Sequence, residues 1–169
     1  KGFRNSVHVT NGNQTGGAGT ADKVEFYTRL EAQDIANSGW NYTSTSSYIT
    51  LSFWVKSSVA QNFYGYIINL DGTIKNFPFE TGALSADTWT KITKTLPGHA
   101  DLSFNNDNGE GLRIVILPFL GTDQTGSVST GSWSTYNSAT RTPNNTSTWY
   151  TTNDATFEFT GVQLEVGDT

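Results

Sequence analysis

The stretch Tyr48–Lys56 reads YITLSFWVK. Every second residue in it belongs to a strongly apolar series, and the residues between them are of mixed or polar character. The apolar series consists of Ile49, Leu51, Phe53 and Val55. Because successive side chains of a β-strand point to opposite faces, this period of two predicts a strand with one buried face.

Turn-forming residues separate several other short apolar stretches, which we also expect to be strands. Their ranges are Phe3–Thr10, Lys23–Leu30, Phe63–Leu70, Ile74–Phe79, Trp89–Leu96, Leu112–Leu120 and Ala155–Val166. Asp71-Gly72 is a hairpin-turn signal between two of them, and Glu31–Asn37 is expected to hold one short helical turn. Many short strands joined by turns indicate a sandwich or a barrel. We therefore predict a single all-β domain over residues 1–169, built as a two-sheet antiparallel β-sandwich of jelly-roll type.

Two of these stretches predict further detail. Leu112–Leu120 is apolar on both faces in its middle, which predicts a central strand covered from both sides. In Ala155–Val166, the apolar residues change parity at Thr160-Gly161. One extra residue at that point would restore a single buried face, so we predict a β-bulge at Gly161.

The composition excludes several classes of function. The net charge is −5, and the 10 lysines and arginines are scattered along the chain, so we expect no nucleic-acid binding. No apolar run approaches the ~20 residues of a membrane-spanning helix, so we expect no membrane insertion. The chain has no cysteine, which excludes disulfides and thiolate metal sites.

The sequence offers little support for an active site. Ser6, His8 and an aspartate could be drawn as a catalytic triad, but the G-x-S-x-G motif that would support it is absent. His8 and His99 are better interpreted as ordinary strand or surface histidines. No spacing singles out one pair of carboxylates for glycoside hydrolysis. We therefore predict that the protein is not an enzyme.

Asp107–Glu110 concentrates oxygen-bearing side chains of the kind that bind calcium. The same run, with its Asp-Asn-Gly sequence, is typical of a tight turn. We favour the turn, and we predict neither a metal site nor a cofactor.

The long polar segment that follows Leu120 contains aromatic residues away from any aliphatic pattern. An aromatic ring can stack on the C–H face of a sugar while neighbouring polar side chains bond to its hydroxyls. We predict a carbohydrate site formed by Trp133, Tyr136, Arg141 and Trp149. The alternative is that these rings fasten the long segment onto the sandwich.

The end of the chain, TGVQLEVG at Thr160–Gly167, resembles a segment near the end of many bacteriophage tail-fibre and other virion proteins. Other blocks resemble the same family in the same order. They are TLSFWVKS at Thr50–Ser57, Asp87-Thr88-Trp89 with Pro97-Gly98, DNGEGL at Asp107–Leu112, and Ser132-Trp133. The resemblance covers Lys23 to Thr169, and its specificity comes from the agreement of several blocks together.

This resemblance implies a jelly-roll domain similar to carbohydrate-binding modules, carried on a tail fibre or another appendage as part of a longer virion protein. It also implies a homotrimer at the extracellular virion surface that contacts other virion subunits and binds host-surface glycan. Related modules often hold a structural calcium with an acidic pair in the last strand. Thr160 and Gly161 stand at that place here, so this calcium site is not expected.

Two other interpretations stay open. The domain could be purely structural, as a capsid decoration or fibre-assembly unit whose aromatic residues are buried against neighbouring subunits, because such interfaces also favour Trp, Tyr and Arg. It could also be an ancillary carbohydrate-binding module of a glycoside hydrolase.

Overall fold

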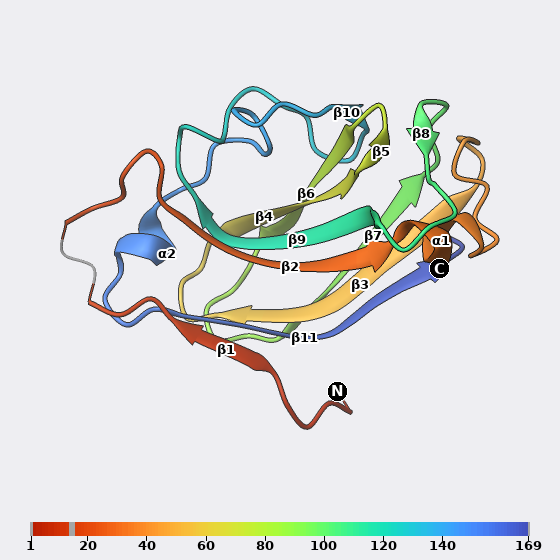
Figure 1. Cartoon of the computed structure of the whole chain (residues 1–169). Helices are drawn as coiled ribbons and strands as arrows, with labels where there is room; N and C mark the ends of the chain where they lie inside the picture. The colour runs from red at the N-terminus through yellow and green to blue at the C-terminus, as the bar shows by residue number, and fades with distance from the viewer. Residues whose placement is uncertain (1, 14–15, 169) are drawn as a thin grey trace.

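The computed structural model describes residues 2–13 and 16–168, which form an antiparallel β-sandwich of two main sheets (Figure 1). Sheet A contains, in spatial order, β1 (Val7–Thr10), β11 (Thr156–Val166), β3 (Tyr48–Ser57) and β7 (Thr90–Pro97). Sheet B contains β10 (Ser134–Thr135), β6 (Lys75–Ala83), β4 (Asn62–Asn69), β9 (Glu110–Leu120) and β2 (Lys23–Glu31). The remaining elements are the strand pair β5 (Asp71–Gly72) and β8 (Leu102–Ser103), and the helices α1 (Ala32–Ala36) and α2 (Thr148–Thr151). The predicted all-β sandwich is confirmed.

The alternation on β3 places its apolar series in the core, as predicted. Ile49, Leu51, Phe53 and Val55 are all buried, and the residues between them are more exposed apart from Thr50. This series packs against the inner face of sheet B in one continuous apolar cluster. Contacts between rings tie the two sheets together, because Phe53 of β3 lies 6.2 Å from Phe79 of β6, centroid to centroid.

β9 is buried on both faces, which confirms the prediction from its doubly apolar sequence. Ile114 and Ile116 belong to the core between the sheets. Val115 and Leu117 belong to a second, smaller cluster on the outer face of sheet B. The long segment after β9 covers part of this outer face (Figure 1).

The predicted β-bulge is also confirmed. The register of β11 against β3 shifts between Thr160 and Gln163, and Gly161 has a φ of 62°. This left-handed backbone conformation is accessible to glycine without steric cost. The bulge brings Phe159 and Leu164 onto the same side of the sheet, where both pack against the core.

The expected hairpin between β4 and β6 is present, and the two strands pair antiparallel. The turn itself is longer than a two-residue hairpin, because Asp71 and Gly72 pair with β8 instead. The helical turn predicted over 31–37 is α1. The two-residue strands and α2 were not predicted, since such short elements contain too few residues to show a period.

The bulge leads to a prediction about stability. A Cβ at Gly161 would lie 2.4 Å from the Phe3 ring, whereas a Cβ at Gly131, which also has a positive φ of 78°, meets nothing within 4 Å. We expect Gly131→Ala to cost about 1–2 kcal/mol from its backbone conformation alone. Gly161→Ala should cost more, because the Phe3 ring must also move. Urea denaturation of both variants measures their free energies of unfolding. Equal losses would show that the Phe3 ring moves aside at no cost in stability.

Candidate functional site

The long segment between β9 and β11 carries all four residues of the predicted carbohydrate site, but it distributes them over three different places. It crosses the outer face of sheet B, adds β10 to the edge of that sheet and ends in α2 (Figure 1). Its packing decides which of the four side chains are available to a ligand.

Trp149 is part of the core, which corrects its assignment to the carbohydrate site. Its side chain is 0% exposed, and its ring lies 6.2 Å from that of Phe157. Its indole Nε1 donates a hydrogen bond to the carbonyl oxygen of Thr156 at 2.9 Å. A ring with no exposed face cannot stack on a sugar.

Trp133 closes one lateral side of the sandwich. Its ring packs edge-on against Phe77 of β6, with the centroids 5.3 Å apart. Its indole Nε1 donates to the carbonyl oxygen of Pro97 at the end of β7, at 2.7 Å. The half-buried ring therefore joins sheet B to sheet A, which is the fastening role that the sequence left open as an alternative.

Tyr136 and Arg141 come together on the outer face of sheet B, beside Tyr66 of β4. Tyr136 packs against the outer cluster that contains Tyr66. Burial raises the pKa of Tyr66, and the charge of Arg141 and its hydrogen bond to Tyr66 offset part of that rise. The nearby Glu25 carboxylate of β2 also raises the pKa of Tyr66. Two of the four predicted residues are thus neighbours on one face.

The uncovered part of this face carries a group of residues that the sequence did not single out. We call Tyr27 and Arg29 of β2, together with Glu110 and Arg113 of β9, the arginine–tyrosine patch. Arg29 lies directly opposite Arg113 in the β2–β9 pairing, and Tyr27 is two residues along β2 on the same face.

Ion pairs and cation–π contacts hold the patch together. Arg113 forms a bidentate pair with Glu110, with Nε–Oε1 at 2.6 Å and Nη2–Oε2 at 2.7 Å. Arg29 Nε lies 3.3 Å from Glu110 Oε2. Both guanidinium carbons lie 5.3 Å from the centroid of the Tyr27 ring. The patch therefore presents a half-exposed aromatic ring beside fixed donors and acceptors, which are the two features that sugar recognition needs.

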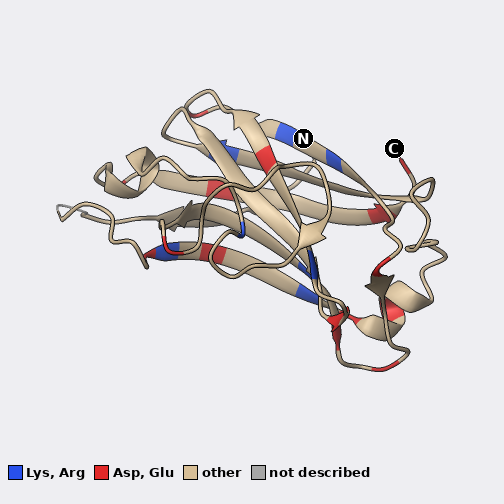
Figure 2. Ribbon diagram, turned by 90° about the horizontal axis from the view of Figure 1, so that it is seen from above, with Lys and Arg blue, Asp and Glu red and all other residues tan. Residues whose placement is uncertain are grey.

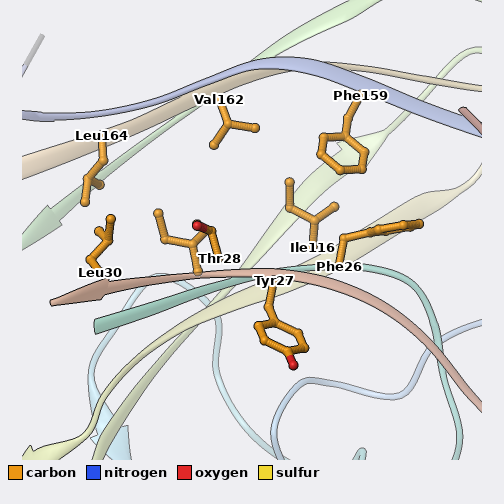
Figure 3. A pocket seen from close by; sticks show the side chains of 9 residues that line it. Phe26, Tyr27, Thr28, Leu30, Ile116, Phe159, Val162 and Leu164 are labelled. Atoms are coloured by element: carbon orange, nitrogen blue, oxygen red, sulfur yellow. The ribbon is translucent and has the colours of Figure 1, made fainter. Parts of the chain in front are cut away.

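A second surface feature is an apolar groove between β2 and β11 (Figure 3). It encloses about 360 Å³. Phe26 and Leu30 line it from β2, and Phe159 and Leu164 line it from β11. Tyr27 points away from the groove toward the opposite side of β2 (Figure 3). β2 therefore separates the two features, with the groove on its inner side and the arginine–tyrosine patch on its outer side.

The candidate catalytic residues do not assemble into a triad in the described part of the chain. Ser6 Oγ donates to Glu158 Oε2 at 3.3 Å. His8 lies 3.4 Å from Glu158 Oε1 and 3.4 Å from Thr10 Oγ1. Ser6 is therefore held by the carboxylate and not by the imidazole. Burial opposes ionisation of Glu158, but Lys56 and His8 together outweigh it and lower the pKa of this carboxyl.

Lysine and arginine positions lie on several strands of the sandwich, and acidic positions occur both on strands and in loops (Figure 2). Over residues 2–13 and 16–168, no cluster of three or more His, Asp or Glu side chains could hold a metal ion. Asp107 instead stabilises its own turn, because Oδ1 accepts a hydrogen bond from the backbone N–H of Gly109 at 2.9 Å.

No helix among the described residues is long and apolar enough to cross a membrane.

Comparison with known proteins finds no matching family model, no matching curated protein and no matching solved structure.

The arginine–tyrosine patch could have been found only in part from the sequence. In the predicted strand over 23–30, the parity that buries Phe26 and Leu30 turns Tyr27 and Arg29 outward. The partner strand and its register, which bring Arg113 opposite Arg29, depend on tertiary pairing. No local pattern marks that pairing.

The burial of Trp149 leads to a second prediction. Trp149→Ala should destabilise the protein by about 3–5 kcal/mol, because it removes a fully buried ring and leaves a cavity. Trp149→Phe should cost less, since part of the ring volume stays. Circular dichroism during urea unfolding measures both. A Trp149→Ala protein as stable as the parent would contradict the core assignment.

Proposed function

We propose that this domain is a jelly-roll module of a phage tail fibre or another virion appendage, and that it recognises host-surface carbohydrate through the outer face of sheet B. It then acts at the extracellular virion surface as part of a homotrimer, together with other virion subunits, and has no enzymatic activity. The block resemblance in the sequence supports the virion assignment. The arginine–tyrosine patch is the observation that carries the binding role.

The patch suits a sugar for three physical reasons. Tyr27 is 51% exposed, so a pyranose ring can contact the part of its side chain that the guanidinium groups of Arg29 and Arg113 leave uncovered. Glu110, Arg29 and Arg113 supply acceptors and donors at fixed positions beside that ring. All four residues stand on two paired strands, and a strand scaffold holds a site more rigidly than a loop does.

Removing the Tyr27 ring tests this proposal. Tyr27→Ala should weaken glycan binding by about 10–30-fold, as loss of a central aromatic contact does. Tyr48→Ala is the matched control, because Tyr48 is also an exposed strand tyrosine but belongs to sheet A. A glycan array identifies the ligand, and titration calorimetry then measures the affinity of each variant.

Equal affinity of the parent and a folded Tyr27→Ala variant would remove the patch from the site. Binding to no glycan and to no host cell by the folded domain would reject the carbohydrate role and favour the structural one.

A specific observation favours fibre assembly as a second candidate function. Four of the seven exposed large hydrophobic side chains among the described residues are Phe3, Val7, Val162 and Val166, which lie on β1, β11 or the adjoining N-terminal segment. The groove lining contains no charged residue among those described. This surface supplies both a hollow and protruding apolar side chains, so a second copy of the chain offers a matching partner for it.

Introducing a charge at the groove tests the assembly role. Val162→Glu should convert an oligomer to monomers, because it places a carboxylate in an interface that would be apolar. Ile74→Glu is the control, since Ile74 is similarly exposed but does not line the groove. Analytical ultracentrifugation measures the masses. A parent protein that is monomeric at high concentration would reject this role for the groove.

A further inference from the structure

We infer that Arg29 and Arg113 form an anion-binding subsite, and that the preferred glycan is acidic, with a carboxylate or sulfate group bound by this arginine pair. The inference rests on the proposed glycan-binding role and names the class of sugar. It comes from the charges within the arginine–tyrosine patch.

The two arginines are an unusual pair for a sheet surface. They lie directly opposite each other on β2 and β9, where like charges destabilise the pairing of strands. The chain has only 10 lysines and arginines and a net charge of −5. Two cations adjacent to each other on one exposed face therefore form a local exception to an acidic protein.

The Glu110 carboxylate makes two short hydrogen bonds to Arg113 and a single longer contact with Arg29. Glu110 engages Arg113 with two bonds of 2.6 and 2.7 Å. Arg29 has one longer approach of 3.3 Å, through Nε, and its side chain is 58% exposed. Since a guanidinium carries five N–H donors, most donors of Arg29 face solvent and are available to a ligand.

The other acidic groups near the patch have partners of their own. Glu31 accepts a hydrogen bond from Gln33 Nε2 at 2.6 Å. Glu25 pairs with Lys23 Nζ at 2.8 Å. Glu110 is the carboxylate that contacts both Arg29 and Arg113, so a ligand anion would meet the N–H groups of Arg29 that Glu110 does not bind.

The position of Tyr27 connects Arg29 to a sugar. The guanidinium carbon of Arg29 lies 5.3 Å from the centre of the Tyr27 ring. A pyranose lying against Tyr27 would carry a ring carboxylate or a sulfate ester within reach of Arg29. Guanidinium groups bind such planar or tetrahedral anions with paired, charge-assisted hydrogen bonds.

The experiment compares acidic glycans with their neutral counterparts on the full chain. The carboxylate arm uses oligogalacturonate against its methyl ester, and the sulfate arm uses dextran sulfate against dextran. The parent protein should bind at least one acidic member about 10-fold more tightly than its neutral counterpart. Arg29→Gln should remove that preference, so that the variant binds the acidic member no more tightly than its neutral counterpart.

Lys91→Gln is the matched control, because it removes the same charge from an exposed position on sheet A. Equal loss of acidic binding in the two variants would show a general charge effect and overturn the subsite. Equal binding of acidic and neutral glycans would also overturn it, while the proposed glycan-binding role would stand.

If no polymer binds, the proposed function is rejected. A nuclear magnetic resonance titration then tests the anion subsite by itself. Glucuronate should shift the Nε–Hε signals of Arg29 and Arg113, and glucose at the same concentration should not. Shifts with glucuronate would support an anion subsite independently of glycan recognition. Unchanged signals would overturn the subsite as well.

Discussion

Burial of sheet B on both of its faces is the constraint on which the rest of the structure depends. Its inner face packs against sheet A, and the apolar side chains on the outer face of β4 and β9 need a separate cover. Exposing that outer cluster to water would cost about 25 cal/mol for each Å² of apolar surface. The long segment between β9 and β11 supplies the cover, and Tyr136 packs into it. The chain has no cysteine, and this packing holds the polar segment in place together with the β10–β6 pairing and the Trp133 hydrogen bond to Pro97.

The two lateral sides of the sandwich differ in how they are closed. This difference determines where the apolar groove and the arginine–tyrosine patch lie. Trp133 closes the side between β6 and β7 by contacting Phe77 and bonding to Pro97. On the other side, β1 pairs with the first part of β11, from Thr156 to Phe159, and the rings of Phe26 and Phe159 lie 5.2 Å apart between the two sheets. The apolar groove lies there. β2 forms the edge of sheet B at this side, so its inward residues line the groove and its outward residues form the arginine–tyrosine patch.

Sequence periodicity was sufficient to predict an all-β sandwich, because β3 buries one regular series of side chains and β9 is apolar on both faces. The alternation in 48–56, the doubly apolar middle of 112–120 and the parity change at Gly161 all correspond to features of the structure. The site was predicted less well. An aromatic residue in a polar segment has the same local sequence whether its ring faces solvent, as a ligand site requires, or enters the core, as Trp149 does. The pairing of Arg29 with Arg113 depends on the register of distant strands, which neither segment encodes alone.

This arrangement separates the residues that hold the fold from those available for recognition. Trp149 and Trp133 fasten the long segment, so changing them alters the scaffold before it alters any ligand contact. Tyr27 and Arg29 stand on an edge strand with their side chains about half exposed, and the core does not require either of them. Exposed polar side chains away from core packing usually contribute little to stability. Glu110 and the Tyr27 ring offset the repulsion between Arg29 and Arg113 in the free protein, and the N–H groups of Arg29 that Glu110 does not bind are the ones that the proposed anion would use.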